Sequence, residues 1–93
     1  MIRSFHCKKT QALFEGVKCD KQWLAFRRLA ERKLAMLDAA GLLKDLAIPP
    51  ANGLEALKRD RKGQHSIRIN DQFRICFVWT VNGPAEVEIV GYH

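Results

Sequence analysis

The chain has 93 residues, 47% of them hydrophobic and 28% charged, a composition that supplies one modest core and excludes general disorder. Sixteen Lys and Arg against ten Asp and Glu leave a net charge of +6. That excess favours an anionic partner, whether nucleic acid, an acidic protein or an anionic membrane surface. We expect a single domain over residues 1–93.

The cysteines and the apolar runs bear on where the protein acts. Cys7, Cys19 and Cys76 form no CxxC pair, which favours a reduced, cytosolic chain. Residues 1–11 lack the apolar centre of a secretory signal. The longest apolar run, residues 75–79, is too short to span a membrane. These features predict a cytoplasmic protein with no membrane partner.

The first half of the chain predicts helices after a short opening strand at residues 1–5. Residues 8–16 predict a short helix. Asp20 is expected to cap a longer helix that ends near Gly41, with one more turn at residues 42–46. The longer helix is predicted because apolar residues recur there at steps of three and four. They are Trp23, Phe26, Ala30, Leu34 and Leu37.

The second half of the chain predicts an antiparallel sheet. Pro49, Pro50 and Gly53 predict an irregular stretch, after which the hydrophobic period becomes two. Strands are expected around residues 65–70, 73–80 and 86–92, with residues 54–58 as a further strand if they pair. Because the helices come first and the sheet second, the pattern indicates an α+β fold, in which an N-terminal strand and two helices pack on a C-terminal sheet.

Alternation along these strands assigns their side chains to two faces. Arg68, Arg74 and Tyr92 fall on one face, so a phenol and two arginines are expected to share a surface. The other face is expected to pack on the helices. It would carry Ile67, Ile69, Phe73, Ile75, Phe77, Val87 and Ile89.

Positive charge is concentrated in residues 58–74, which hold six basic side chains against two acidic ones. A basic sheet face with an aromatic residue and a histidine at its edge suits single-stranded RNA. Arginine and lysine would also stabilise charge on a phosphate during cleavage by the RNA's own 2′-OH, while His93 would exchange protons. No metal is required. The basic side chains are Lys58, Arg59, Arg61, Lys62, Arg68 and Arg74.

Four segments together resemble the HigB-type toxins of the RelE superfamily, also called plasmid-maintenance killer proteins. They are "MIRSF", "AERKLAMLDAA", "PPANGLEALKRDRKGQHSIRINDQFRICFVW" and "VEIVGYH", and the likeness covers essentially the whole chain. The resemblance implies helices on an antiparallel sheet and ribosome-dependent cleavage of mRNA in the A site, which leaves a 2′,3′-cyclic phosphate. It implies no cofactor. It also implies a cognate helix-turn-helix antitoxin of the HigA type, through which the complex would bind operator DNA.

The resemblance also implies roles for four residues. Lys58 matches the family's active-site lysine, and Arg74 matches the arginine that stabilises the scissile phosphate. Tyr92 and His93 match the aromatic–histidine end of the family. The general base stays open among His93, Glu55 and the chain-terminal carboxylate.

Three positions depart from the family's pattern. Gly91 stands where an acidic residue usually precedes Tyr-His, Arg59 stands where glycine is frequent, and Glu55 stands where some members have histidine. Two alternatives remain, the first of them because Gly91 removes a carboxylate. One is a non-cleaving RNA or ribosome binder that blocks translation. The other is a corepressor that stabilises a DNA-bound antitoxin.

Other polar residues favour structural interpretations. His65 falls on the apolar face, where packing is expected. Cys76 is expected to act as a small hydrophobe. The pair His6–Cys7 has no second pair at ligand spacing, so no metal site is predicted. Arg27, Arg28 and Arg32, on the longer helix, would be solvated or would meet ribosomal RNA or an acidic antitoxin segment.

Overall fold

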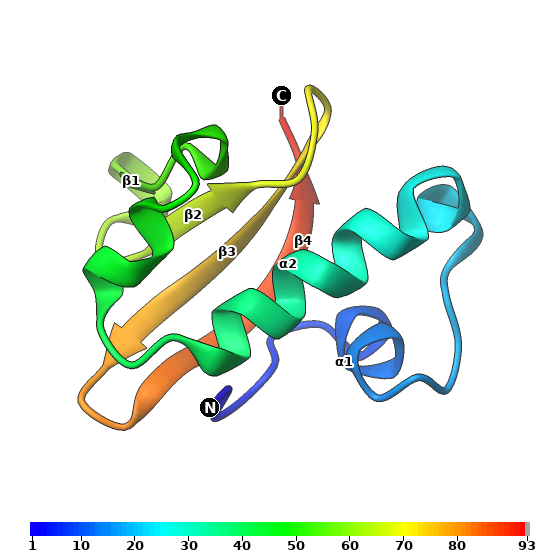
Figure 1. The fold of residues 1–93 in the computed structure, drawn as a ribbon, viewed down its shortest axis with the longest axis horizontal. Coiled ribbons are helices and arrows are strands. Elements are labelled where there is room, and N and C mark those ends of the chain that lie inside the picture. The colour runs from blue at the N-terminus through cyan, green and yellow to red at the C-terminus, as the bar shows by residue number, and fades with distance from the viewer. Residues whose placement is uncertain (93) are drawn as a thin grey trace.

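The computed structural model describes residues 1–92, so the predicted site residue His93 lies outside the described residues. Two helices lie on one side of a four-stranded antiparallel sheet with the strand order β1-β2-β3-β4 (Figure 1). This arrangement confirms the predicted α+β class. The elements are α1 (Lys8–Phe14), α2 (Arg27–Ala39), β1 (Glu55–Ala56), β2 (His65–Arg68), β3 (Phe73–Thr80) and β4 (Gly83–Gly91).

The longer predicted helix is present but divided. The Asp20 carboxylate accepts a hydrogen bond from the Gln22 backbone N–H at 3.3 Å, as expected of a cap. A 3₁₀ helix, η1, then runs over Lys21–Phe26, and α2 begins only at Arg27. At the junction Phe26 leaves helical geometry, with φ −126° and ψ 26°, and its ring lies 5.0 Å from that of Phe73. The predicted extra turn is the 3₁₀ helix η2, Leu43–Ala47.

The proline-rich stretch is more ordered than predicted, because Pro50–Asn52 form a further 3₁₀ helix, η3. The Asn52 side chain is fully buried. Its amide donates to the Leu46 carbonyl at 3.0 Å, and its carbonyl accepts from the buried ammonium of Lys33 on α2. The hydrogen bonds of Asn52 therefore connect the proline-rich stretch to α2 and η2.

The predicted opening strand is reduced to a single parallel bridge between Phe5 and Val87. Residues 3–10 nevertheless cover the outer edge of β4. The Arg3 N–H donates to the Pro84 carbonyl at 2.7 Å, and the Thr10 hydroxyl accepts from the Ile89 N–H at 3.1 Å. Backbone groups at this edge are thereby paired, which protects it from pairing with other chains.

The core forms between the sheet and α2. Ile67, Ile75 and Ile89 lie opposite one another across three strands and are buried, as alternation predicted. The pairing of β3 and β4 shifts between Cys76 and Val78, so the regular alternation does not extend through the first part of β4. Among the residues that the structure describes, no helix combines the length and apolar character needed to cross a membrane.

Candidate active site

The register of the sheet brings Arg74 and Tyr92 together. Arg74 lies opposite Val90 in the β3–β4 pair, and Tyr92 follows two residues later on the same face. The Tyr92 N–H donates to the Gln72 carbonyl at 2.9 Å, which extends the pairing beyond β4. The guanidinium carbon of Arg74 lies 5.1 Å from the centre of the Tyr92 ring. The predicted sharing of one face by these two side chains is confirmed.

Arg74 is held in place without having all of its donors occupied. Its side chain is 21% exposed, and its Nη1 lies 3.8 Å from Oε1 of Glu55, a separation longer than a hydrogen bond. Its Nε is buried and makes no hydrogen bond to any of residues 1–92. A buried N–H without a partner costs about 1–3 kcal/mol. An anionic oxygen in front of Arg74 would meet donors that are already oriented.

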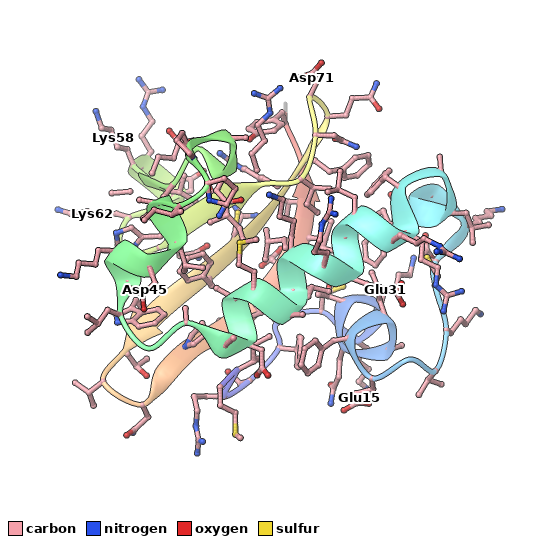
Figure 2. All side chains as sticks on the ribbon, in the orientation of Figure 1. Glu15, Glu31, Asp45, Lys58, Lys62 and Asp71 are labelled. Atoms are coloured by element: carbon pink, nitrogen blue, oxygen red, sulfur yellow. The ribbon has the colours of Figure 1, made fainter. Side chains whose placement is uncertain are left out.

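Arg68 lies directly opposite Arg74 in the β2–β3 pair, an arrangement in which two like charges repel. The Arg68 guanidinium forms an ion pair with Asp71 and donates to the Asn70 carbonyl at 3.2 Å. Asp71 lies at the tip of the β2–β3 hairpin (Figure 2) and lines one hollow with Gly91 and Tyr92. The Arg68 side chain thus has partners within its own hairpin but is 47% exposed, and its contact with phosphates stays a prediction.

A basic loop, residues 57–64, stands beside Arg74. The loop is closed by a hydrogen bond from the Leu57 N–H to the Gln64 carbonyl at 2.8 Å. Inside it, Lys58 precedes a short 3₁₀ helix, η4 (Arg59–Arg61). Lys58 and Lys62 project outward on the same side of the molecule (Figure 2). An open hollow of 550 Å³ lies between the loop and the sheet, and it is lined by Glu55, Ala56, Leu57, Lys58, Arg59, Asp60, Arg61 and Arg74.

Arg61 is turned toward the sheet. Its Nη2 lies 3.5 Å from Oε1 of Glu88 on β4, and its Nη1 donates to Oε1 of Gln64 at 3.1 Å. Beneath these groups Cys76 is fully buried. Burial raises the pKa of the Cys76 thiol, although the charges of Arg61 and Arg74 act in the opposite direction. The thiol is thus a small buried hydrophobe, as predicted.

His65 stacks on Phe77, with 6.2 Å between ring centres, and its Nδ1 is buried with no hydrogen-bond partner among the described residues. This position fits the packing role predicted for it. His6 lies instead near Glu88, with 3.7 Å between Nε2 and Oε2. Nowhere in residues 1–92 do three His, Cys, Asp or Glu side chains gather closely enough to hold a metal ion.

The structure thus brings together most of the predicted site residues. Lys58, Arg59, Arg61 and Arg74 line one hollow, and Tyr92 lies against Arg74. Lys62 is exposed beside the hollow. Sequence reasoning gave no role to Glu88, although the alternation that placed Tyr92 on this face places Glu88 there as well.

Comparisons with known proteins match this chain to one toxin family. The model of a family described as the RelE-like toxin of the type II toxin-antitoxin system HigB matches residues 4–93. Toxin HigB-1 of Vibrio cholerae serotype O1 is 52% identical over 54 residues, which cover 58% of this chain and 56% of that protein. An uncharacterized protein of Haemophilus influenzae is 38% identical over 55 residues, 59% of this chain and 54% of its own length. The chain therefore aligns with about half the length of these two curated relatives.

Proposed function

The chain belongs to the HigB family of RelE-like toxins from type II toxin-antitoxin systems, and we propose that it is an endoribonuclease that cleaves messenger RNA in the ribosomal A site. The observation that carries this proposal is the environment of Arg74. Its guanidinium is oriented by Tyr92 and attracted by Glu55, yet its Nε has no hydrogen-bond partner among the described residues. The Arg74 side chain is 21% exposed, and a scissile phosphate would accept hydrogen bonds at the exposed side of this guanidinium.

The proposed reaction uses the message's own 2′-OH as the nucleophile. The 2′ oxygen bonds to the adjacent phosphorus, and the bond from phosphorus to the 5′ oxygen breaks. The products are a 2′,3′-cyclic phosphate and a 5′-OH end. Charge develops on the phosphate oxygens on the way, and cations fixed beside them stabilise it. Arg74 and Lys58 fill this role, and the reaction consumes no metal or cofactor.

The reaction also needs an acceptor for the 2′-OH proton and a donor for the 5′ oxygen. We assign the acceptor to Glu55, because among residues 1–92 its carboxylate is the one paired with Arg74, with 3.8 Å between Oε1 and Nη1. Its side chain is 56% exposed, so an incoming nucleotide can reach it. Glu55 thereby offsets the absence of a carboxylate at Gly91. His93 is assigned the role of proton donor.

The surrounding cations are proposed to hold the message and the ribosome. Arg59 and Lys62 are exposed next to the hollow, where they would contact phosphates of mRNA and of small-subunit ribosomal RNA. Tyr92 would stack on a base of the A-site codon while its face holds Arg74. The proposed site of action places the protein in the cytoplasm.

Family membership implies a cognate antitoxin. We propose that this antitoxin is a helix-turn-helix protein and that the toxin meets operator DNA only through it. The net charge of +6 would favour an acidic segment of the antitoxin over the hollow, where it would compete with RNA.

The proposal is tested by primer extension on ribosome-bound messages incubated with the wild type, Arg74→Ala and Arg3→Ala. Arg3 is an exposed arginine beside the opposite end of β4, where its N–H meets Pro84, so its variant is a matched control. We expect new 5′ ends within A-site codons with the wild type and Arg3→Ala and none with Arg74→Ala. Stalled translation without new ends would contradict cleavage and favour a non-cleaving blocker. An absence of any toxicity when the chain is expressed alone would favour a corepressor.

A further inference from the structure

Glu88 lies at the centre of a second cluster of polar side chains, next to the proposed cleavage site. It lies on β4 opposite Cys76 and on the same face as Tyr92. Its carboxylate is only 16% exposed and lies between the Arg61 guanidinium, at 3.5 Å, and the His6 imidazole, at 3.7 Å. Glu88 therefore joins the loop of residues 57–64, the strand β4 and the N-terminal segment.

The loop of residues 57–64 makes few other fixed contacts with the sheet through its charged side chains. Its exposed cations, Lys58, Arg59 and Lys62, form no ion pair with any of residues 1–92. Arg61 alone among the loop's basic side chains is partly buried, at 32% exposure. Within the loop, backbone hydrogen bonds connect Arg61 to Lys58 at 3.2 Å and Gln64 to Arg61 at 2.9 Å. The position of Arg61 thus sets the position of Lys58.

Loss of the Glu88 charge would also change the balance of attraction and repulsion between charges around Arg61. Arg61 and Arg74 both line the hollow, and like charges on one surface repel each other. Glu88 is the carboxylate that offsets this repulsion at Arg61, as Glu55 does at Arg74. Without it, a half-buried cation loses its partner, and the loop is driven away from the sheet.

We propose that Glu88 is a positioning residue for RNA cleavage, which holds Arg61 so that the loop presents Lys58 to the hollow beside Arg74. The inference rests on the proposed function and adds to it a residue that does not touch the RNA. Glu88 acts on the cleavage rate through Lys58, since the backbone of η4 transmits its hold on Arg61 over three residues.

The cleavage test compares Glu88→Gln with Glu86→Gln. Glu86 is an exposed glutamate on the same strand, and its side chain makes no ion pair with residues 1–92. Single-turnover cleavage on programmed ribosomes is measured in the wild-type and Lys58→Ala backgrounds. Misplacement of a reacting group by about 1 Å costs about a hundredfold in rate, so we expect a loss of about tenfold to a hundredfold for Glu88→Gln. Glu86→Gln should not change the rate. In the Lys58→Ala background Glu88→Gln should cause no further loss, and an equal loss in both backgrounds would overturn the proposal.

A second measurement needs no ribosome, and it separates failure of this inference from failure of the proposed function. Amide hydrogen exchange is followed in the isolated protein at Arg61, Lys62 and Gln64, whose N–H groups make the internal bonds of the loop. We expect Glu88→Gln to accelerate exchange at these amides and to leave the Ile89 amide, which donates to Thr10, protected. If the loop amides exchange as in the wild type, Glu88 does not hold the loop, whether or not the protein cleaves RNA. If Ile89 also loses protection, the role of Glu88 is general stability and the proposal is wrong.

Discussion

The guanidinium carbon of Arg74 lies 5.1 Å from the centre of the Tyr92 ring. The two residues belong to neighbouring strands and reach this contact because Arg74 pairs with Val90, two residues before Tyr92. A cation over an aromatic face contributes about 0.5–1 kcal/mol at exposed sites. The contact is therefore a modest source of stability, and its larger effect is to fix the plane in which Arg74 presents its donors.

The contact predicts that Tyr92→Phe and Tyr92→Ala differ. Phenylalanine keeps the aromatic face over Arg74, whereas alanine removes both the face and the surface on which a base would stack. We expect Tyr92→Ala to lose about fivefold to a hundredfold in cleavage, because stacking contributes about 1–3 kcal/mol per base. Tyr92→Phe should retain most of the activity. The rates are compared on programmed ribosomes, and equal activity in Tyr92→Ala and the wild type would remove Tyr92 from the site.

The assignment of the proton acceptor predicts a specific defect for Glu55→Gln. Removal of a general base lowers a rate by about 10²–10⁴-fold, while glutamine keeps the size of the side chain. Cleavage should fall by that amount, and ribosome binding should be unchanged or tighter because one negative charge is lost. Gly91→Asp, introduced into the Glu55→Gln protein, should restore part of the rate. Unaltered cleavage by Glu55→Gln would show that another group accepts the 2′-OH proton.

Arg59 is expected to destabilise the protein through its backbone. Its φ is +57°, in the left-handed region that costs a residue with a Cβ about 1–2 kcal/mol. The resemblance noted above associates this position with glycine, which adopts that region without strain. We predict that Arg59→Gly raises the free energy of unfolding by about 1 kcal/mol, whereas Arg59→Ala, which removes the charge but keeps the Cβ, gives no comparable gain. Urea titration distinguishes them, and equal stability of the two variants would contradict the backbone explanation.

Lys33 predicts a change of stability with pH. Desolvation by burial, together with the charge of Arg32, lowers the pKa of Lys33 below its usual 10.5. Between the folded and unfolded pKa values the unfolded chain binds more protons, so the free energy of unfolding rises with pH through that window. Lys33→Met removes this rise. Urea titrations from neutral pH to pH 10.5 give the free energies of unfolding of the wild type and Lys33→Met. The difference between the two free energies isolates Lys33, because the raised pKa of Cys76 affects both proteins alike. A difference that stays constant or shrinks with increasing pH would contradict the prediction.

Short-range sequence patterns predicted the features that depend only on residues close together in the chain. Alternation placed Arg74 and Tyr92 on one face, and their contact confirms it. The cap at Asp20 was also predicted, because it needs only the side chain and the turn that follows. The break at Phe26 was not, since it accompanies packing against Phe73, a residue 47 positions away in the printed sequence.

Contacts between charged residues far apart in the chain could not be predicted from sequence patterns. No spacing rule connects Arg61 to Glu88, because the contact depends on how the loop of residues 57–64 folds back over β3. The bulge between β3 and β4 was missed for a similar reason. It requires a positive φ at Glu86, +52°, in a residue type that gives no signal of it.

The proposed function depends most on cleavage of RNA at the Arg74 face through the RNA's own 2′-OH. The most direct measurement uses ribosomes programmed with a message, and with the same message carrying a 2′-deoxy nucleotide on the 5′ side of the scissile phosphate. We expect a 2′,3′-cyclic phosphate end from the all-ribose message with the wild type, and no cut in the deoxy message or with Arg74→Ala. Cutting of the deoxy message at the same phosphate, or undiminished cutting by a folded Arg74→Ala protein, would contradict it.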